Sequence, residues 1–211
     1  LLTMTEAEVG HLYPTDEKGN KPVAYYWART ATCSNPSCRA EVPLLKQFYL
    51  ANKKSKKVYL NPIINGTDIQ FEIKHGEYKE KDLPGWNNRC VLTCPCCGSV
   101  TTTNQLKEQF KAKRTGERLL AIITESPNGK SYRLPKNVEL DSLKYVPKNQ
   151  ERPTERMEVG NNRNFNTPGW GIELYGEMFS DRQIYFLNNL LNQMNSLSIQ
   201  RELPYNKALL S

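Results

Sequence analysis

The first two thirds of the chain carry a hydrophobic pattern that predicts a series of antiparallel strands. The run Pro22–Thr32 is rich in β-prone residues, and alternation in Ile69–Ile73 places its apolar side chains on one face. The dipeptide Asn65-Gly66, just before the second of these runs, is a strong hairpin signal. Further strands are expected at Ala40–Leu50, Val58–Leu60, Cys90–Thr93, Leu119–Thr124 and Ser131–Leu134.

Helical signals are fewer but more distinct. Thr102 and Gln105 have capping-box spacing and predict a short helix that ends near Lys113. Ser180 and Gln183 repeat this spacing before the longest helical pattern in the chain. The apolar positions of that pattern fall on one half of the helical wheel: Ile184, Phe186, Leu187, Leu190, Leu191, Met194 and Leu197. The periodicity therefore predicts an amphipathic C-terminal helix.

Four cysteines in two pairs are the strongest chemical signal. Cys33 and Cys38 are spaced C-x4-C, and Cys94 and Cys97 are spaced C-x2-C within Cys-Pro-Cys-Cys-Gly. Two such pairs from distant parts of a chain are typical of a zinc ion held by four thiolates, as in a zinc ribbon. A closed shell of four sulfurs leaves no open coordination position, so the expected zinc is structural.

Other interpretations of the cysteines remain open. Cys90 and Cys96 complete the set of six, and the sequence does not decide whether either replaces one of the four favoured ligands. Cys96 occupies the variable position of the C-P-x-C-G turn and is expected to point away from the metal. One pair is alternatively just two buried thiols, or Cys94 and Cys97 form a redox dithiol, which usually needs a helix N-terminus in a βαβ context.

The predicted elements divide the chain into four consecutive segments. Residues 1–21 form an N-terminal lead segment, in which Met4–Leu12 is expected to end a helix. Residues 22–135 form a zinc-ribbon β domain with one short helix, and residues 136–168, rich in Pro, Asn, Lys and Glu, form an extended connector. Residues 169–211 form a C-terminal helical segment. The expected fold class is α+β, with antiparallel β hairpins around a zinc ribbon and a C-terminal amphipathic helix.

The chain is basic, with a formal net charge of +7 and a pI near 9.0. This balance favours an anionic partner, of which nucleic acid is the commonest. The candidate phosphate-contacting residues are Lys53, Lys54, Lys56, Lys57, Lys111, Lys113 and Arg114. The alternative is that these side chains are merely solvated, the lysines before residue 60 deterring edge pairing at a hairpin tip. Four aromatic residues are candidates for base stacking or for the core: Tyr25, Tyr26, Trp27 and Trp86.

Several function classes lack their sequence signatures. No apolar run approaches the roughly 18 residues of a membrane-spanning helix, and no signal peptide is visible, so we expect a cytoplasmic protein without a membrane partner. There is no Gly-rich phosphate loop, no G-x-S-x-G and no H-E-x-x-H. His11 and His75, the two histidines, are not at ligand spacing from a cysteine. The segment is therefore not expected to be an enzyme by itself.

The order of motifs along the chain resembles a stretch of large prokaryotic adenine-specific DNA methylases that carry a zinc-ribbon insertion. The resemblance covers nearly the whole chain. It rests on His11–Pro14, Pro22–Arg29, Cys33 and Cys38 with Ala40–Leu44, Cys94–Gly98, Gly116–Leu120, Tyr132–Pro135 and Gly176–Gln183. Only the four cysteines carry over as functional positions.

The resemblance implies that the parent enzyme binds S-adenosylmethionine and methylates the N6 amine of an adenine flipped out of the duplex. The motifs for those steps are absent here, since neither Asn61–Ile64 nor Leu203–Asn206 is a substitute. We therefore expect a non-catalytic zinc-binding insertion domain that contacts DNA, or aids target recognition, beside the remainder of the methyltransferase. The alternatives are a self-sufficient zinc-ribbon nucleic-acid-binding protein, a thiol oxidoreductase and a purely structural spacer.

Overall fold

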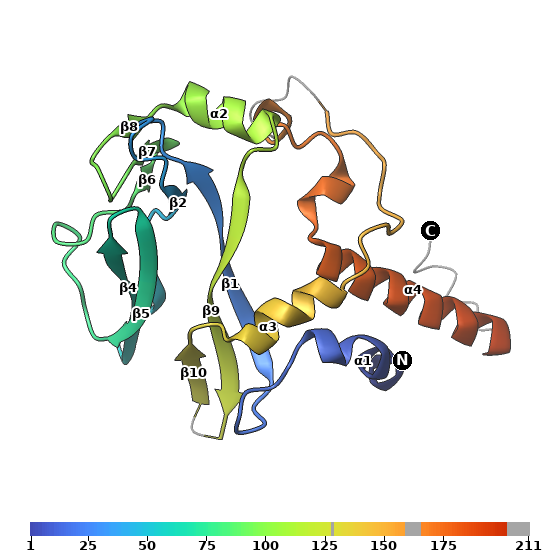
Figure 1. Cartoon of the computed structure of the whole chain (residues 1–211). Helices are drawn as coiled ribbons and strands as arrows, with labels where there is room; N and C mark the ends of the chain where they lie inside the picture. The colour runs from blue at the N-terminus through green and yellow to red at the C-terminus, as the bar shows by residue number, and fades with distance from the viewer. Residues whose placement is uncertain (128, 159–165, 202–211) are drawn as a thin grey trace. The chain divides into compact units, whose positions relative to one another are not determined.

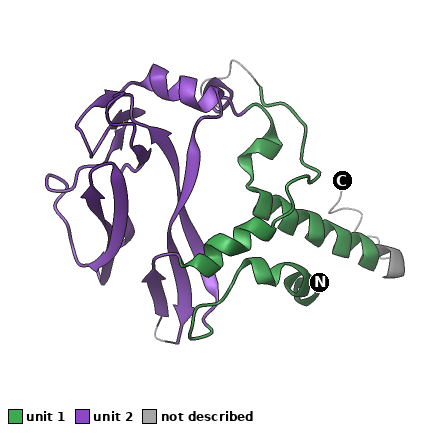
Figure 2. Cartoon of the chain, in the orientation of Figure 1, with its two compact units in different colours: residues 1–19, 136–158, 173–211 green, residues 20–135, 159–172 purple. Residues whose placement is uncertain are grey.

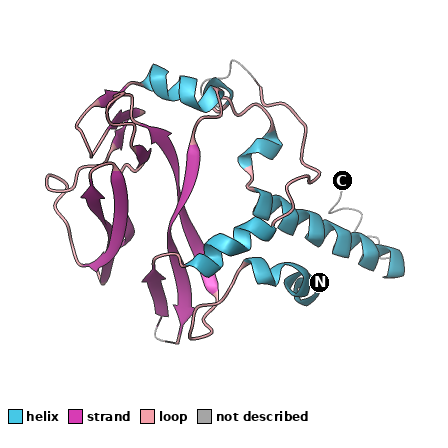
Figure 3. Cartoon of the chain, in the orientation of Figure 1, coloured by secondary structure: helices cyan, strands magenta, loops and turns pink. Residues whose placement is uncertain are grey.

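The structure, a computed structural model, describes residues 1–127, 129–158 and 166–201. The chain divides into two compact units, shown in Figure 2. Unit 1 comprises residues 1–19, 136–158 and 173–211, and unit 2 comprises residues 20–135 and 159–172. Figure 3 shows that the strands lie in unit 2 and that most helices lie in unit 1. The presence of helices together with antiparallel sheets confirms the α+β class.

The largest sheet of unit 2 has four antiparallel strands in the order β10-β9-β1-β2. Strand β1 (Pro22–Thr32) has the predicted bounds and pairs with β9 (Gly116–Ser126) along most of its length (Figure 1). The short strand β2 (Glu41–Pro43) pairs with the end of β1, and β10 (Gly129–Arg133) closes the predicted hairpin with β9. The register of β1 against β9 shifts between Tyr26 and Trp27, which marks a β-bulge.

A second sheet contains three strands in the order β3-β4-β5. Strand β3 (Tyr49–Lys53) pairs with β4 (Lys56–Asn65), which pairs with β5 (Asp68–His75). Asn65 pairs with Asp68, so the Asn-Gly hairpin prediction is confirmed. Strand β4 is longer than predicted because it continues into this hairpin instead of ending at Leu60.

The third sheet is small and leads into the helix of unit 2. Its strands are β6 (Asn87–Asn88), β7 (Val91–Thr93) and β8 (Val100–Thr101). Helix α2 (Thr103–Lys111) follows at once, and its N-cap Thr102 forms the predicted capping box with Gln105. The chain thus passes from the second cysteine pair through β8 into α2, which begins six positions after Cys97.

One hydrophobic core joins the three sheets of unit 2. Phe48 is fully buried, and its ring meets Trp86 edge-on at 5.1 Å between centroids. Leu60, Leu92 and Leu106, from β4, β7 and α2, are at most 1% exposed. Two of the favoured cysteines belong to the same cluster, so the candidate site is continuous with the core.

Unit 1 is helical. Its elements are α1 (Leu2–Val9), η1 (Gly10–Leu12), α3 (Asn137–Ser142), η2 (Leu143–Tyr145), η4 (Tyr175–Met178) and α4 (Asp181–Arg201). Arg182 is buried and donates to the carbonyl oxygen of Leu12 at 3.1 Å, while its guanidinium lies 4.5 Å from the centre of the Tyr13 ring. This contact ties the first turn of α4 to the N-terminal segment.

Several sequence predictions differ from the structure. Ala40–Leu50 is not one strand, because β2 ends at Pro43, which has no amide hydrogen for a ladder. Residues 136–168 are not simply an extended connector, since α3 and η2 occupy part of them, and residues 159–165 lie outside the described part of the chain. Residues 169–172 belong to unit 2 and not to the C-terminal segment.

The start of the C-terminal helix α4 agrees with the prediction, whereas the burial of its apolar stripe agrees only in part. Its capping box is confirmed, because the Gln183 amide bonds to the Ser180 hydroxyl and the Ser180 amide to the Gln183 side chain. Ile184 is buried as the periodicity requires. Leu187 and Leu191 of the same stripe are exposed, so that half-wheel is not uniformly covered. The segment Leu203–Asn206 lies outside the described residues.

A membrane-spanning helix needs about 20 consecutive, mostly apolar residues. Within the ranges that the structure describes, no helix is both long enough and apolar enough to cross a bilayer.

We expect Gly85→Ala to destabilise unit 2 by about 1–3 kcal/mol, because a Cβ at this position would lie 2.0 Å from the backbone oxygen of Lys46. Gly85 and Lys46 approach each other where the segment before Cys94 packs against the segment after Cys38. The Asn87 amide also donates to the Leu45 carbonyl in this region. Denaturant unfolding followed by far-UV circular dichroism and by the fluorescence of the three tryptophans measures the loss. The matched control is Gly10→Ala, where the nearest atom is 3.5 Å away and no loss is expected.

Candidate metal centre

The first cysteine pair lies in a tight turn at the end of β1. The amide of Cys33 donates to the Ala40 carbonyl at 2.9 Å, which closes the turn across its base. The amides of Cys38 and Arg39 both donate to the carbonyl of Asn35. Arg39 has a φ of 51°, a left-handed conformation that is costly for a residue with a side chain. The turn thus holds both sulfurs on one side at the expense of local strain.

The second pair lies in a similar turn between β7 and β8. The Cys94 amide donates to the Ser99 carbonyl, and the Gly98 amide donates back to the Cys94 carbonyl, both at 2.9 Å. Gly98 has a φ of 74° and directly follows the second cysteine, as Arg39 does in the first turn. In both turns, therefore, the residue after the second cysteine has a left-handed backbone conformation. Gly98 makes this conformation predictable from the sequence, whereas Arg39 does not, because arginine rarely adopts a positive φ.

The two turns are bonded directly to each other. The amide of Ser34 donates to the Thr101 hydroxyl at 3.1 Å, and the Ser34 hydroxyl donates to the Val100 carbonyl at 3.2 Å. The side-chain amide of Asn35 donates to the Ser99 hydroxyl at 3.3 Å. These bonds align the turns without any contribution from a metal.

The four predicted sulfurs meet where the turns face each other. The Sγ atoms of Cys33, Cys38, Cys94 and Cys97 all lie within 4.8 Å of one another. The Cys33–Cys97 distance is 3.7 Å and the Cys38–Cys94 distance is 3.8 Å. A tetrahedral ion with metal–sulfur bonds of about 2.3 Å separates its ligands by about 3.8 Å. The arrangement has the dimensions of a four-sulfur metal site.

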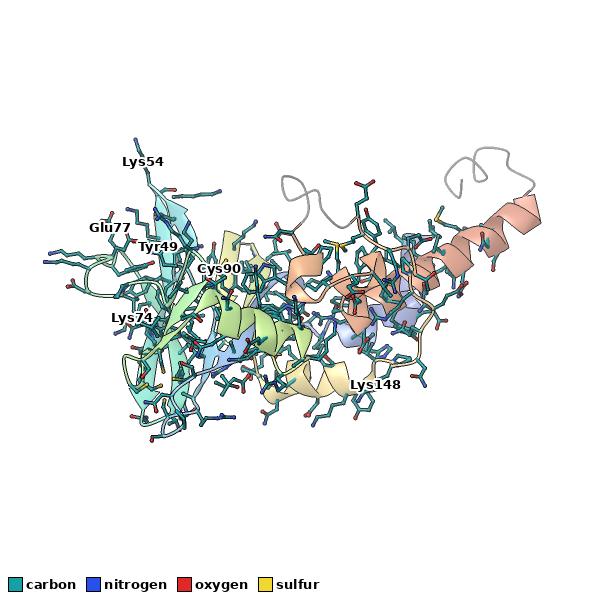
Figure 4. The ribbon with its side chains drawn as sticks, turned by 90° about the horizontal axis from the view of Figure 1, so that it is seen from above. Tyr49, Lys54, Lys74, Glu77, Cys90 and Lys148 are labelled. Atoms are coloured by element: carbon teal, nitrogen blue, oxygen red, sulfur yellow. The ribbon has the colours of Figure 1, made fainter. Side chains whose placement is uncertain are left out.

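The two remaining cysteines are not part of the cluster. Cys90 is exposed and lies before β7, where it is labelled in Figure 4. Cys96 is half-buried, and desolvation by burial raises the pKa of its thiol to about 11. The structure therefore groups the four cysteines that the sequence favoured and leaves these two aside.

The sulfurs differ in their affinity for protons. Burial raises the pKa of the Cys33 thiol to about 12. Hydrogen bonds from the Ser99 hydroxyl and amide lower the pKa of the exposed Cys97 thiol to about 6. The Asn35 side-chain amide also faces the Cys97 sulfur, at 3.7 Å. Sequence analysis gave no role to Asn35 or Ser99, although turn residues next to a cysteine pair commonly supply N–H groups to the sulfurs.

The first predicted basic cluster lies at the tip of the β3–β4 hairpin. Lys53 and Lys54 are exposed, and Lys54 points away from the hairpin in Figure 4. Lys57 pairs with Glu77, and Lys56 donates to the Lys130 carbonyl with its ammonium 5.1 Å from the centre of the Tyr132 ring. The four lysines are thus unequal, because two are engaged by neighbours.

The second predicted basic cluster lies at the C-terminal end of α2. Lys111, Lys113 and Arg114 are all exposed. The Lys113 ammonium donates to the Gly171 carbonyl at 2.8 Å. The structure therefore places the two basic clusters on different elements of unit 2.

The predicted aromatic residues separate into two groups. Trp86 is 6% exposed and is a core residue. Trp27 is 38% exposed, and Tyr25 and Tyr26 are half-buried on β1. The core interpretation therefore holds for Trp86, while Trp27 is accessible to a ligand.

We expect Cys38→Ala and Cys97→Ala to abolish stoichiometric metal binding and to unfold much of unit 2, because metal binding at such sites is worth roughly 10 kcal/mol of folding free energy. Elemental analysis of the gel-filtered chain and circular dichroism are the measurements. Cys90→Ala and Cys96→Ala are the matched controls and should each keep one ion per chain. Equal metal loss from all four variants would contradict the assigned ligand set.

Metal affinity should fall as the pH falls, and more steeply below about pH 6. Without metal, the raised pKa of Cys33 keeps that thiol protonated at neutral pH, so binding must displace its proton. Cys97, with a pKa of about 6, is already a thiolate at neutral pH and competes for a proton only in acid. Competition with a chromophoric chelator across this range tests the change of slope, and a pH-independent affinity would contradict it.

Comparison with known proteins adds no relative. No protein-family model matches this chain, and neither a curated protein nor a solved structure does.

Proposed function

We propose that the four-sulfur cluster holds a structural Zn²⁺ ion and that unit 2 is built as a zinc ribbon. Four thiolates in tetrahedral spacing are the donor set of structural zinc sites, whereas oxygen-binding metals prefer carboxylates and carbonyls. The spacing of the sulfurs and the paired left-handed turns support this assignment. All four positions of such an ion are filled by protein, so it would stabilise the fold and supply no catalytic chemistry.

Nucleic acid is the partner that the charge distribution supports best. Unit 2 contains 20 of the 29 lysines and arginines but only nine of the 22 acidic residues, a formal charge of +11. Unit 1 contains the other nine basic and 13 acidic residues, a formal charge of −4. The net charge of +7 therefore understates how basic the β unit is. This segregation is the observation that carries the proposal of a DNA contact.

The parent protein that we propose is an adenine-specific N6 DNA methyltransferase, with this chain as its non-catalytic insertion domain. The order of sequence motifs supports this assignment. S-adenosylmethionine would then bind to the remainder of the parent, and this chain would contact DNA or aid target recognition. A self-sufficient zinc-ribbon nucleic-acid-binding protein would use the same site and the same charges. The reading frame on either side of this segment distinguishes the two.

The geometry gives less support to a thiol oxidoreductase. A redox Cys-x-x-Cys pair acts from a helix N-terminus, where the dipole stabilises a thiolate. Here Cys97 is followed by strand β8, and α2 begins only at Thr103. Cys94 and Cys97 each lie close to a cysteine of the other pair, which suits a shared ion.

We expect the metal-loaded chain to bind duplex DNA with a strong salt dependence, and Lys53→Gln/Lys54→Gln to weaken it most. Each lost phosphate contact lowers the slope of log K against log salt by about 0.9. Lys56→Gln/Lys57→Gln should lower the slope less, because those side chains are engaged by Tyr132 and Glu77. Fluorescence anisotropy with a labelled duplex over a series of salt concentrations measures the slopes.

The matched control is Lys144→Gln/Lys148→Gln, which removes the same charge from the acidic unit 1; Lys148 is labelled in Figure 4. This variant should bind DNA as the unaltered chain does. Equal weakening by all three double variants would show that only net charge matters. Absence of salt-dependent binding would leave the chain as a structural spacer.

A further inference from the structure

A pocket of about 400 Å³ opens in unit 2, and none of the predicted roles accounts for it. This volume is within the range of small-molecule and base-binding sites. Residues from β1, α2, η3 (Pro168–Trp170) and the segment after β2 line it. Its principal side chains are Tyr26, Trp27, Arg29, Asn87, Phe110 and Trp170. Four of the 13 lining residues are aromatic, four are aliphatic, and four are polar or charged.

Strand β1 contributes four consecutive residues to the lining, from Tyr26 to Arg29. Tyr26 lies opposite Ala121 of β9 and Trp27 lies opposite Leu119, so the extra residue of the bulge, Leu120, belongs to β9. Strand β2 pairs with β1 only at Thr30–Thr32, so it does not cover the edge of β1 beside Trp27. Trp27 keeps 38% of its surface exposed there.

The opposite wall is held in place by the packing of η3 on α2. The rings of Phe110 and Trp170 meet edge-on at 5.5 Å, and the Lys107 ammonium lies 5.6 Å from the centre of the Trp170 ring. Gly171 is necessary for this approach, because a Cβ there would lie 2.8 Å from the Cα of Lys111. Trp170 is therefore a fixed wall of the pocket.

The polar groups of the pocket suit a ligand with a negative charge and a hydrogen-bonding edge. The Oδ1 atom of Asn87 is buried and accepts no hydrogen bond from the residues that the structure describes. Arg29 and Lys46 also line the pocket, and no carboxylate is among the described lining residues. Arg29 pairs with Glu117 at 2.9 Å but remains about half exposed. An amide oxygen without a partner can accept a hydrogen bond from an N–H group of a ligand.

We infer that this pocket binds a single unstacked nucleobase of the DNA that unit 2 contacts. This inference rests on the proposed function. Aromatic side chains stack on the faces of any base, an amide oxygen accepts from a base edge, and Arg29 and Lys46 supply positive charge for the flanking phosphates. A base must leave its stack to enter such a pocket, and an unpaired base does so at the least cost. The pocket should therefore favour a duplex with one unpaired base.

The test compares a fully paired duplex with the same duplex carrying a single-base bulge, using the metal-loaded full chain. Unaltered protein should bind the bulged duplex roughly tenfold more tightly, as expected for one stacked base. Trp27→Leu and Trp170→Leu should each remove most of this preference and leave the affinity for the paired duplex unchanged. Tyr145→Leu, which removes an aromatic residue that is 74% exposed in unit 1, is the matched control.

The outcomes separate this inference from the proposed function. Equal binding of the two duplexes, or a preference that survives both tryptophan variants, overturns the pocket assignment and leaves the DNA contact standing. Failure to bind either duplex overturns both. Binding of free deoxynucleoside monophosphate as tightly as the bulged duplex would show that the pocket serves a small molecule and not DNA. Metal content and circular dichroism of each variant verify that the fold is intact.

Discussion

Four cysteine sulfurs that lie within 4.8 Å of one another are the constraint on which unit 2 depends. The sulfur pairs across the site join residues 56 and 64 positions apart, so they link the end of β1 to the turn before β8. The individual hydrogen bonds between the two turns are each worth only about 1 kcal/mol. Binding of an ion would stabilise the fold by more than these hydrogen bonds do together. The buried Cys33 and Cys94 make the site part of the hydrophobic core.

The cysteine cluster lies between the end of β1 and the start of α2 along the fold. Strand β1 enters the first turn and α2 leaves shortly after the second, so the cluster brings the strand near the helix. The Gln109 side chain of α2 confirms this proximity, because it both donates to and accepts from the backbone of Thr32 at 2.9 Å. The aromatic pocket lies between the same two elements. The cysteine cluster and the pocket are therefore built on one scaffold, although only the cysteine cluster was visible as a motif in the sequence.

Local features of the fold were predictable because short-range chemistry determines them. The two capping boxes, the Asn-Gly hairpin and the bounds of β1 each depend on residues within a few positions of one another. Long-range features were not predictable to the same degree. Leu45 and Phe48, which follow the break at Pro43, are buried in a core built from distant strands. Helix α3, within the expected connector, ends at buried Ser142, whose hydroxyl donates to the carbonyl of Leu12, 130 positions away.

The sequence by itself determined which four cysteines come together, because cysteine spacing and turn residues are local properties that chemistry restricts strongly. It also determined the net charge and the class of fold. Tertiary structure alone decided that the charge is divided between two units of opposite sign, and that Trp27 and Trp170, 143 positions apart in the chain, line one pocket. Those arrangements depend on which distant surfaces pack together, and no periodicity or spacing within one segment encodes that choice.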